Sequence, residues 1–324
     1  MTYSVAKALC ATALLASSIA PLAQAVGSPD PFCSLPTYSL VQAAKQYPTL
    51  TTPINEVLKN AIATWYTDSE DPSSLKSNLN NLLSTCSSNT RVALDYRKWV
   101  QNLANTVGNR KVLYVLEPDA VGLVANGGCA VQNNYTANVR TSLEILSKNP
   151  NADIYLDVGF WTLENADSAV KTANAVKQLS TVGRLKGITL NTSNYRPSAD
   201  MAALCTTFQK AYGSSNLNCV VDTSRNYNNN PPSREWCNAR FGGIGKLPTA
   251  STGYSNIDYF IWVKPPGESD GACDGSDRSP DAMKGPASGM FFKDLFVQLW
   301  NNGIFVKERG FPRVSAKIQF AAPL

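Results

Sequence analysis

Lys111-Val-Leu-Tyr-Val-Leu-Glu-Pro-Asp119 is an apolar run that ends abruptly in two carboxylates. Such a run is typical of a strand that is buried on both faces of a parallel sheet. The same shape recurs at Ala152–Asp157, Gly187–Asn191, Cys219–Asp222 and Tyr259–Lys264. We therefore expect five strands, each of which carries polar groups at its C-terminal end.

The spacing of these strand ends predicts how the strands are connected. The ends at Asp119, Asp157, Asn191 and Asp222 lie 38, 34 and 31 residues apart, which is about the length of a strand followed by a helix. Amphipathic patterns typical of helices occur at 136–146, 166–179, 199–212 and 289–300.

Repeats of this kind predict an α/β fold of parallel strands, a (β/α) barrel. In such a barrel the strand ends converge on one face, where active sites lie. A doubly wound open sheet would give a similar period, although no glycine-rich nucleotide loop supports it.

The N-terminus predicts secretion. Lys7, the apolar run 8–20 and Ala23-Gln-Ala25 have the pattern of a signal peptide, so we expect residues 1–25 to be the signal and 26–324 to form one catalytic domain. The net charge is +5, or +4 without Lys7. A charge this small does not indicate nucleic acid or a membrane surface as a partner. We expect a neutral partner and a monomer.

The chain contains no histidine. This excludes Ser-His-Asp and Cys-His catalysis and removes the commonest zinc ligand, so we predict neither a metal nor a cofactor. Acid–base chemistry then falls to carboxylates, and a pair of carboxylates is the usual means of cleaving a glycosidic bond. Trp65, Trp161 and Trp236 lie near the expected strand ends and would suit stacking against sugar rings.

Six motifs occur in one order along the chain: VLEPDAVGLVAN from Val115, YLDVG from Tyr155, NTSNY from Asn191, VDTSRN from Val221, WCN from Trp236 and WVKPPGESD from Trp262. Together, from about residue 61 to about residue 302, they resemble glycoside hydrolase family 6, the inverting cellobiohydrolases and endoglucanases. The resemblance implies a distorted (β/α) barrel. It also implies hydrolysis of β-1,4-glucosidic bonds in cellulose or related β-glucans.

The resemblance also implies roles for single residues. By position, Asp119 is similar to the family's general acid and Asp270 to its candidate base. The side chains that would bind the sugar are Trp65, Trp161, Asn191, Trp236, Lys264 and Glu268.

Several of these residues have structural alternatives. Asp119 could cap the helix that follows its strand, and Asp270 could be a turn former in a loop rich in Gly and Asp. We expect Glu117 to be a buried, hydrogen-bonded support. Asp222 and Arg225 could form a structural ion pair beneath the site.

The chain departs from the family before the acid motif. Family members carry there a strand and a loop whose last aspartate tunes the acid, whereas here the pattern predicts a strand at 61–67, a helix at 73–83 and a second helix at 92–107. We infer that about one strand and its loop are missing near Thr90 and Arg91, either in the real protein or through an error in the gene model, which makes the barrel incomplete. Pairing Cys33 with Cys86, Cys205 with Cys219 and Cys237 with Cys273 leaves Cys129 alone.

The departure leaves two functions open. Without the missing aspartate, we expect Asp119 to have no neighbouring carboxylate that raises its pKa, and hydrolysis to be greatly reduced. The alternative to an active β-1,4-glucanase is therefore a secreted glucan-binding or host-interacting protein with impaired catalysis.

Overall fold

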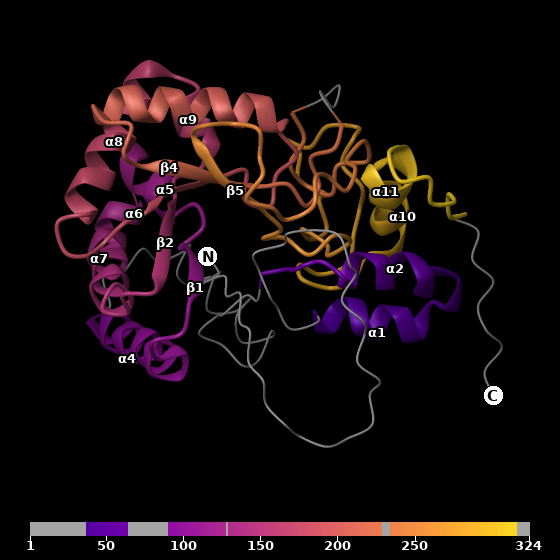
Figure 1. Ribbon diagram of the computed structural model, residues 1–324, viewed down its shortest axis with the longest axis horizontal. Helices are drawn as coiled ribbons and strands as arrows, with labels where there is room; N and C mark the ends of the chain where they lie inside the picture. The colour runs from indigo at the N-terminus through magenta and orange to yellow at the C-terminus, as the bar shows by residue number, and fades with distance from the viewer. Residues whose placement is uncertain (1–36, 64–89, 128, 229–233, 316–324) are drawn as a thin grey trace.

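The computed structural model describes residues 37–63, 90–127, 129–228 and 234–315. Within them, five parallel strands pair in chain order and form a sheet that curls into a half-barrel (Figure 1). The strands are β1 (Val112–Leu116), β2 (Ala152–Asp157), β3 (Gly187–Leu190), β4 (Asn218–Asp222) and β5 (Ile257–Ile261). A doubly wound sheet would reverse its strand order at a switch point. The uninterrupted order therefore confirms the barrel-type prediction.

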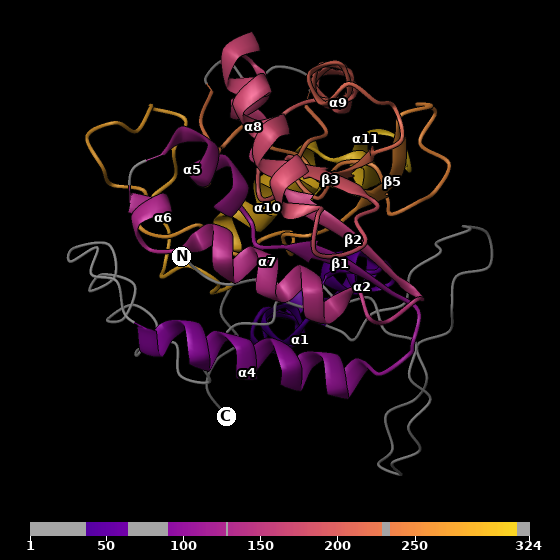
Figure 2. The same ribbon diagram turned by 90° about the vertical axis from the view of Figure 1, so that its left-hand side faces the viewer.

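One group of helices covers the outer face of the sheet (Figure 2). It comprises α4 (Thr90–Val107), α5 (Ala120–Asn126), α6 (Cys129–Gln132), α7 (Tyr135–Leu146), η2 (Phe160–Leu163), α8 (Ala166–Leu179) and α9 (Ser198–Tyr212). A second group lies beyond β5 (Figure 1) and comprises α1 (Tyr38–Gln46), η1 (Pro48–Leu50), α2 (Thr51–Leu58), α10 (Lys293–Asn302) and α11 (Ile304–Lys307). The predicted helices at 92–107, 136–146, 166–179 and 199–212 are confirmed.

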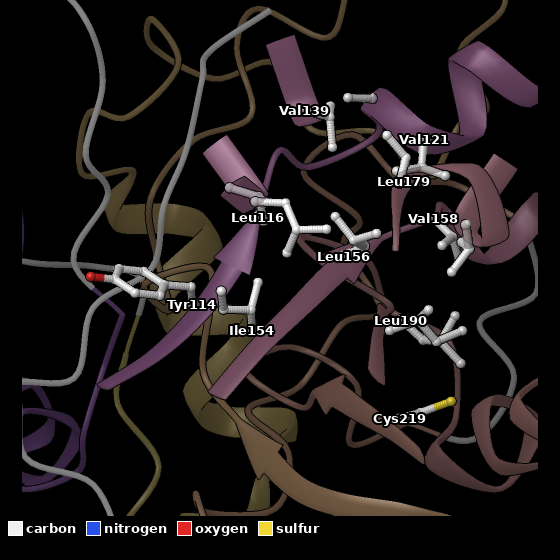
Figure 3. Packing of buried hydrophobic residues seen from close by; sticks show 14 of the residues in the cluster. Tyr114, Leu116, Val121, Val139, Ile154, Leu156, Val158, Leu179, Leu190 and Cys219 are labelled. Carbon is white, nitrogen blue, oxygen red and sulfur yellow. The ribbon is translucent and has the colours of Figure 1, made fainter. Parts of the chain in front are cut away.

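The alternation of side chains along β1 explains why the whole run is apolar. Tyr114 and Leu116 point toward the helices and join the large core cluster (Figure 3), whereas Leu113 and Val115 lie in a smaller cluster on the inner face. All five residues of the strand are buried. A strand that is covered on both faces cannot alternate between apolar and polar residues.

The second helix group has its own core around two tryptophans. Trp262 and Trp300 are each 1% exposed, and Trp300 stacks on Phe305 with ring centroids 4.9 Å apart. Their assignment to the core is confirmed, although Trp262 follows β5 rather than lying in the middle of a strand.

Two predicted boundaries are wrong. β5 ends at Ile261, before the predicted end at Lys264, because the N–H groups of Val263 and Lys264 donate to the carboxylate of Asp222 instead of continuing the ladder. The last long helix begins at Lys293 rather than at Gly289. Gly289 has a φ of +83° and donates its N–H to the carbonyl of Ser269, which is incompatible with the start of a helix.

Two of the expected disulfides are confirmed, Cys205–Cys219 and Cys237–Cys273. The expected Cys33–Cys86 pair, the signal peptide 1–25 and the helix at 73–83 lie outside the described residues, as does the side chain of Cys129.

Of the strand expected at 61–67, only 61–63 is described, and these residues form no strand. The N–H of Ala63 nevertheless donates to the carbonyl of Trp262, just beyond β5. In the described part of the chain, no helix has both the length and the apolar character to cross a bilayer.

Candidate functional site

Asp119 lies at the C-terminal end of β1, immediately before α5. Its backbone is left-handed, with a φ of 68°, and its side chain makes no capping hydrogen bond to the helix. Its N–H donates to Oδ1 of Asp157, the last residue of β2, over 3.0 Å. The capping alternative is therefore wrong, and the side chain of Asp119 is left for another purpose.

Asp119 and Asp157 form a carboxyl pair. Asp157 is 1% exposed, and its Oδ1 also accepts the N–H of Gly159 over 3.1 Å. Burial, together with the negative charge of Asp119, raises the pKa of Asp157 to about 7. Asp119 itself reaches solvent, but surrounding protein atoms displace much of the water around its carboxyl and raise its pKa to about 6.

This pair corrects an expectation from the sequence. Asp119 was expected to lack a carboxyl neighbour and to be ionised, because the sequence pattern indicated that a strand and its acidic loop were missing. Asp157 is such a neighbour, and desolvation alone keeps the pKa of Asp119 well above that of a free aspartate. A protonated carboxyl is thus available near neutral pH.

Asp222, at the end of β4, is a fully buried structural carboxylate. It accepts the N–H groups of Ser193 and Ser224, both over 2.9 Å, and those of Val263 and Lys264 over 3.3 and 3.2 Å. Burial raises its pKa, and these backbone donors oppose the rise. Because the donors come from the segments that follow β3, β4 and β5, Asp222 fixes three strand ends relative to one another.

Asp270 lies at the centre of a second charged group. Its Oδ2 accepts hydrogen bonds from Arg225 Nη1 and from the N–H of Asn238, both over 2.8 Å, and its Oδ1 lies 3.3 Å from Lys264 Nζ. Arg225 is completely buried, and its ion pair is with Asp270. The structural ion pair expected between Arg225 and Asp222 is therefore not the one that forms. Asp270 is also more than a turn former, since two cations converge on its side chain.

The protonation of Asp270 is opposite to that of Asp119. Burial would raise the pKa of the Asp270 carboxyl, but the positive charges of Arg225 and Lys264 outweigh burial, and the net pKa is lowered. The site therefore holds one carboxyl that is readily protonated and one that is firmly ionised. This division is the arrangement that acid–base chemistry on a neutral substrate requires.

Lys264 and Glu268, the residues expected to bind the sugar, adjoin Asp270. Lys264 Nζ donates to the carbonyl of Ser269 over 3.1 Å. Glu268 accepts a hydrogen bond of 2.5 Å from the hydroxyl of Ser39 on α1. Burial raises the pKa of Glu268, while Ser39 and the charge of Lys264 act against the rise.

Contacts between neighbouring strand ends extend along this site. Asp119 contacts Asp157 at the end of β2, and Asp222 binds the backbone of both Ser193 after β3 and Lys264 after β5. Lys264 then contacts Asp270. Since all five strands are parallel, Asp119 and Asp270 lie at the same C-terminal edge of the sheet.

The predicted aromatic residues have different surroundings. Trp236 is 51% exposed, with the guanidinium of Arg278 4.3 Å from its ring centroid. Trp161 is half-buried in η2 and packs edge to face on Phe160. Trp65 lies outside the described residues.

Asn191 is buried and hydrogen-bonded within the protein. It is 1% exposed, and its amide donates to the carbonyls of Asp222 and Arg196 while its Oδ1 accepts the N–H of Arg196. All of these partners belong to the protein, so Asn191 organises the loop after β3. The sequence placed it correctly at a strand end but could not show which way the amide turns.

Glu117 is a buried support, as predicted. It is 3% exposed and accepts a hydrogen bond from the hydroxyl of Tyr96 on α4, which also bonds Ser142 over 3.0 Å. The left-handed backbone of Glu117, with a φ of 50°, turns the chain so that Asp119 rather than Glu117 can meet Asp157.

Substitution of Gly159 by Ala tests how tightly the loop after β2 is built. Gly159 has a φ of +68°, and a Cβ there would lie 2.5 Å from ring atoms of Trp161. We expect a loss of about 1 to 3 kcal/mol in the free energy of unfolding, from backbone strain and displacement of the indole. Urea denaturation measures this loss, and Gly213→Ala is the control for strain alone, since Gly213 has a φ of +80° and no atom near its Cβ position. Equal losses in both variants would contradict close packing of Trp161 on Gly159.

Sequence reasoning missed several residues that complete the site. Asp157 was recognised only as a strand end, and Arg225 was paired with the wrong carboxylate. Asn238, Ser39 and Arg278 were not singled out at all. The strand-end position of Asp157, equivalent to that of the acidic pair after β1, was a signal that could have identified it.

Comparison with known proteins agrees with the motifs. The family model described as "Glycosyl hydrolases family 6" matches residues 83–303. Endoglucanase A of Cellulomonas fimi is 32% identical over 208 residues, which cover 64% of this chain and 42% of that protein. The chain spans less than half the length of the first three curated relatives it matches.

Two further comparisons bear on the fold. The structure of the endoglucanase Cel6 from Mycobacterium tuberculosis, 22% identical, superposes with a TM-score of 0.65 over 86% of this chain and 98% of that one. The probable 1,4-β-D-glucan cellobiohydrolase C of Aspergillus terreus is 29% identical over 347 aligned residues, 89% of this chain and 70% of that protein. This alignment is longer than the whole 324-residue chain. The relative therefore carries segments that this chain lacks, as the hypothesis of a missing strand requires.

Proposed function

The chain belongs to the glycosyl hydrolases family 6, and on this premise we propose that it is a secreted enzyme that hydrolyses β-1,4-glucosidic bonds of cellulose or a related β-glucan with inversion. The observation that carries the proposal is the carboxyl pair of Asp119 and Asp157 at the same sheet edge as the ion-paired Asp270. Relatives named as endoglucanases and exoglucanases support the substrate class.

Asp119 is the proposed proton donor. In an inverting hydrolase the acid protonates the leaving glycosidic oxygen while water attacks the opposite face of the sugar. Asp119 reaches solvent, and its pKa of about 6 leaves a substantial protonated fraction near neutral pH. Asp157 acts behind it, since its buried carboxyl orients the backbone of Asp119 and disfavours loss of the proton.

Asp270 is the proposed ionised partner. Its lowered pKa keeps it charged near pH 6, where Asp119 is partly protonated. The ion pairs that lower this pKa also make it a weak base. We therefore assign to Asp270 the orientation of the attacking water and stabilisation of the positive charge that develops on the sugar, with the proton passing to the carboxylate late in the reaction.

Lys264 and Glu268 are the proposed hydrogen-bonding groups for the sugar, and Trp161 and Trp236 the proposed stacking groups. Lys264 and Glu268 lie beside Asp270, and half of Trp236 is exposed. A neutral polysaccharide is recognised in this way, by hydrogen bonds around the ring edge and by aromatic side chains on its face.

Exchange of Asp157 for Asn tests the role of the carboxyl pair. The amide oxygen can still accept the N–H groups of Asp119 and Gly159, but the negative charge is removed. Two ionised carboxylates in contact repel each other, which makes the last proton of the pair harder to lose, so removing the charge of Asp157 makes its loss easier. Because the acid must be protonated, the pH at which kcat/KM declines on the alkaline side should fall, on the order of one unit.

The measurement is kcat/KM for a soluble cello-oligosaccharide between about pH 4 and about pH 9. Wild type should lose activity as the pH rises through the pKa of Asp119, about 6. An alkaline limb at the same pH in wild type and Asp157→Asn would contradict electrostatic coupling within the pair.

A second candidate function is glucan binding with impaired catalysis. It is favoured by the segments that this chain lacks relative to the Aspergillus terreus protein. Incubation of the purified full chain with cellohexaose, followed by calorimetry for binding and chromatography for products, separates the two candidates. Products that form with wild-type protein support the hydrolase, binding without products supports the second candidate, and neither binding nor products would refute both.

A further inference from the structure

Arg278 fixes one face of Trp236. The guanidinium carbon lies 4.3 Å from the centroid of the indole ring, within the range of a cation–π contact. Trp236 is half-exposed, whereas only 12% of the Arg278 side chain is accessible. The arginine is therefore the buried partner of an exposed aromatic ring.

The plane of the guanidinium is held by two carboxylates. Nη1 donates to Glu235 over 2.6 Å, while Nη2 and Nε donate to the two oxygens of Asp277 over 2.6 and 3.4 Å. These hydrogen bonds engage all three nitrogens and restrain rotation and tilt of the guanidinium over the ring. A lysine in this place could not make these contacts together, because it has one nitrogen and no plane.

Glu235 ties the arginine to the backbone of the tryptophan. Its side chain is 2% exposed and accepts the N–H groups of Trp236 and Cys237 over 3.0 and 2.9 Å. It also accepts the N–H and hydroxyl of Ser279, both over 2.9 Å. One carboxylate thus fixes both the main chain that carries the indole and the cation that covers it, and the Cys237–Cys273 disulfide anchors the same loop.

We propose that Arg278 is a positioning residue that presents the indole of Trp236 as a rigid stacking surface for a pyranose ring of a β-glucan. The sugar-binding part rests on the proposed function. An exposed aromatic side chain that is already fixed loses little rotational freedom when a ligand stacks on it. The ligand then binds more tightly than it would to a freely rotating side chain, although it makes the same contacts. Arg278 should therefore affect KM and binding much more than bond cleavage.

The restraint on the indole can be measured without substrate. Acrylamide quenching of tryptophan fluorescence should be stronger in Arg278→Ala than in wild type, because the covering cation is lost. In a Trp236→Phe background the same exchange should leave quenching unchanged. Glu235 keeps four other donors in Arg278→Ala, so the loop should remain folded. Equal quenching of Arg278→Ala and wild type would overturn the proposal.

Kinetics with cellohexaose test the sugar-binding part. Arg278→Ala should raise KM about 3- to 10-fold, with kcat changed by less than about 2-fold, and Arg278→Lys should recover only part of the loss. In a Trp236→Ala background, Arg278→Ala should have no further effect on KM. The control is Arg97→Ala, which removes an exposed arginine paired with Glu144 on the helical layer and should leave KM unchanged.

The outcomes separate this inference from the proposed function. An unchanged KM in Arg278→Ala, with active wild type, would overturn the inference alone. An equal rise in KM with and without Trp236 would also overturn it, because Arg278 would then contact substrate directly. Wild type that neither binds nor cleaves cellohexaose would overturn the proposed function and the sugar-binding part together, while the quenching result would still decide whether Arg278 restrains the indole.

Discussion

Replacing Asp119 by Asn is expected to lower kcat on cello-oligosaccharides by about 10²- to 10⁴-fold, the usual contribution of a general acid. The amide has the shape of the carboxyl but carries no transferable proton, so the leaving oxygen would depart as an unprotonated alkoxide. Binding should be retained, because the side chains proposed to bind the sugar are elsewhere. Initial rates of product release, together with calorimetric binding of cellohexaose, measure the two effects separately.

Asp153→Asn is the matched control for this exchange. Asp153 lies on β2, the strand that carries Asp157, but near the opposite end and beside Lys186. Its exchange should leave kcat within about 2-fold of wild type, since it is remote from the C-terminal strand ends. A comparable loss in both variants would show that the effect of Asp119→Asn is not specific to its proton.

Replacing Arg225 by Ala is expected to lower the free energy of unfolding by about 3 to 5 kcal/mol, the range for removing one partner of a buried ion pair. Arg225 is completely buried, donates to Asp270 over 2.8 Å and to the carbonyl of Ser193, and lies over the ring of Tyr195 at 4.2 Å. Its loss leaves the Asp270 charge with Lys264 as its remaining ion-pair partner among the described residues.

Urea denaturation measures the free energy of unfolding of Arg225→Ala, and Lys246→Ala is the control for loss of an exposed ion pair. Lys246 forms an exposed pair with Glu308 at 3.0 Å, and loss of such a pair should cost at most about 1 kcal/mol. Arg225→Ala should also lose most of its hydrolytic activity, because Asp270 is no longer fixed. An equal, small loss of stability in both variants would contradict the assignment of Arg225 as the buried support of Asp270.

The positions of the strands were predictable because burial on both faces leaves a strong pattern. A run such as Val112–Leu116 has no polar residue within it, and a left-handed, acidic turn follows at once. The period between strand ends then determined the parallel order. Boundaries were less predictable, because β5 stops just before two residues, Val263 and Lys264, whose N–H groups donate to the distant carboxylate of Asp222.

The positions of the site residues could be predicted from the sequence, but the residues that they contact could not. Asp119 and Asp270 were identified from motifs, and both lie at the C-terminal edge of the sheet. That Asp157 would be the neighbour of Asp119, and Arg225 that of Asp270, depends on contacts across 38 and 45 residues that no local pattern encodes. The orientation of the Asn191 amide could not be predicted for the same reason, because the amide could turn either to the solvent or to the loop after β3.

The segment inferred to be missing near Thr90 and Arg91 changes less of the proposed site than its position suggested. Burial raises the pKa of Asp119 to about 6, so the acid needs no carboxylate from a further strand for a raised pKa. Within the described residues β1 lies at the edge of the sheet, and a further strand there would cover that edge.

Proton NMR of the first products released from cellohexaose tests the account most directly. A protonated Asp119 on one side of the bond and water directed by Asp270 on the other predict that the α-anomer appears first and that the β-anomer grows in later by mutarotation. Initial release of the β-anomer, or binding of cellohexaose with no product over the whole time course, would contradict the account.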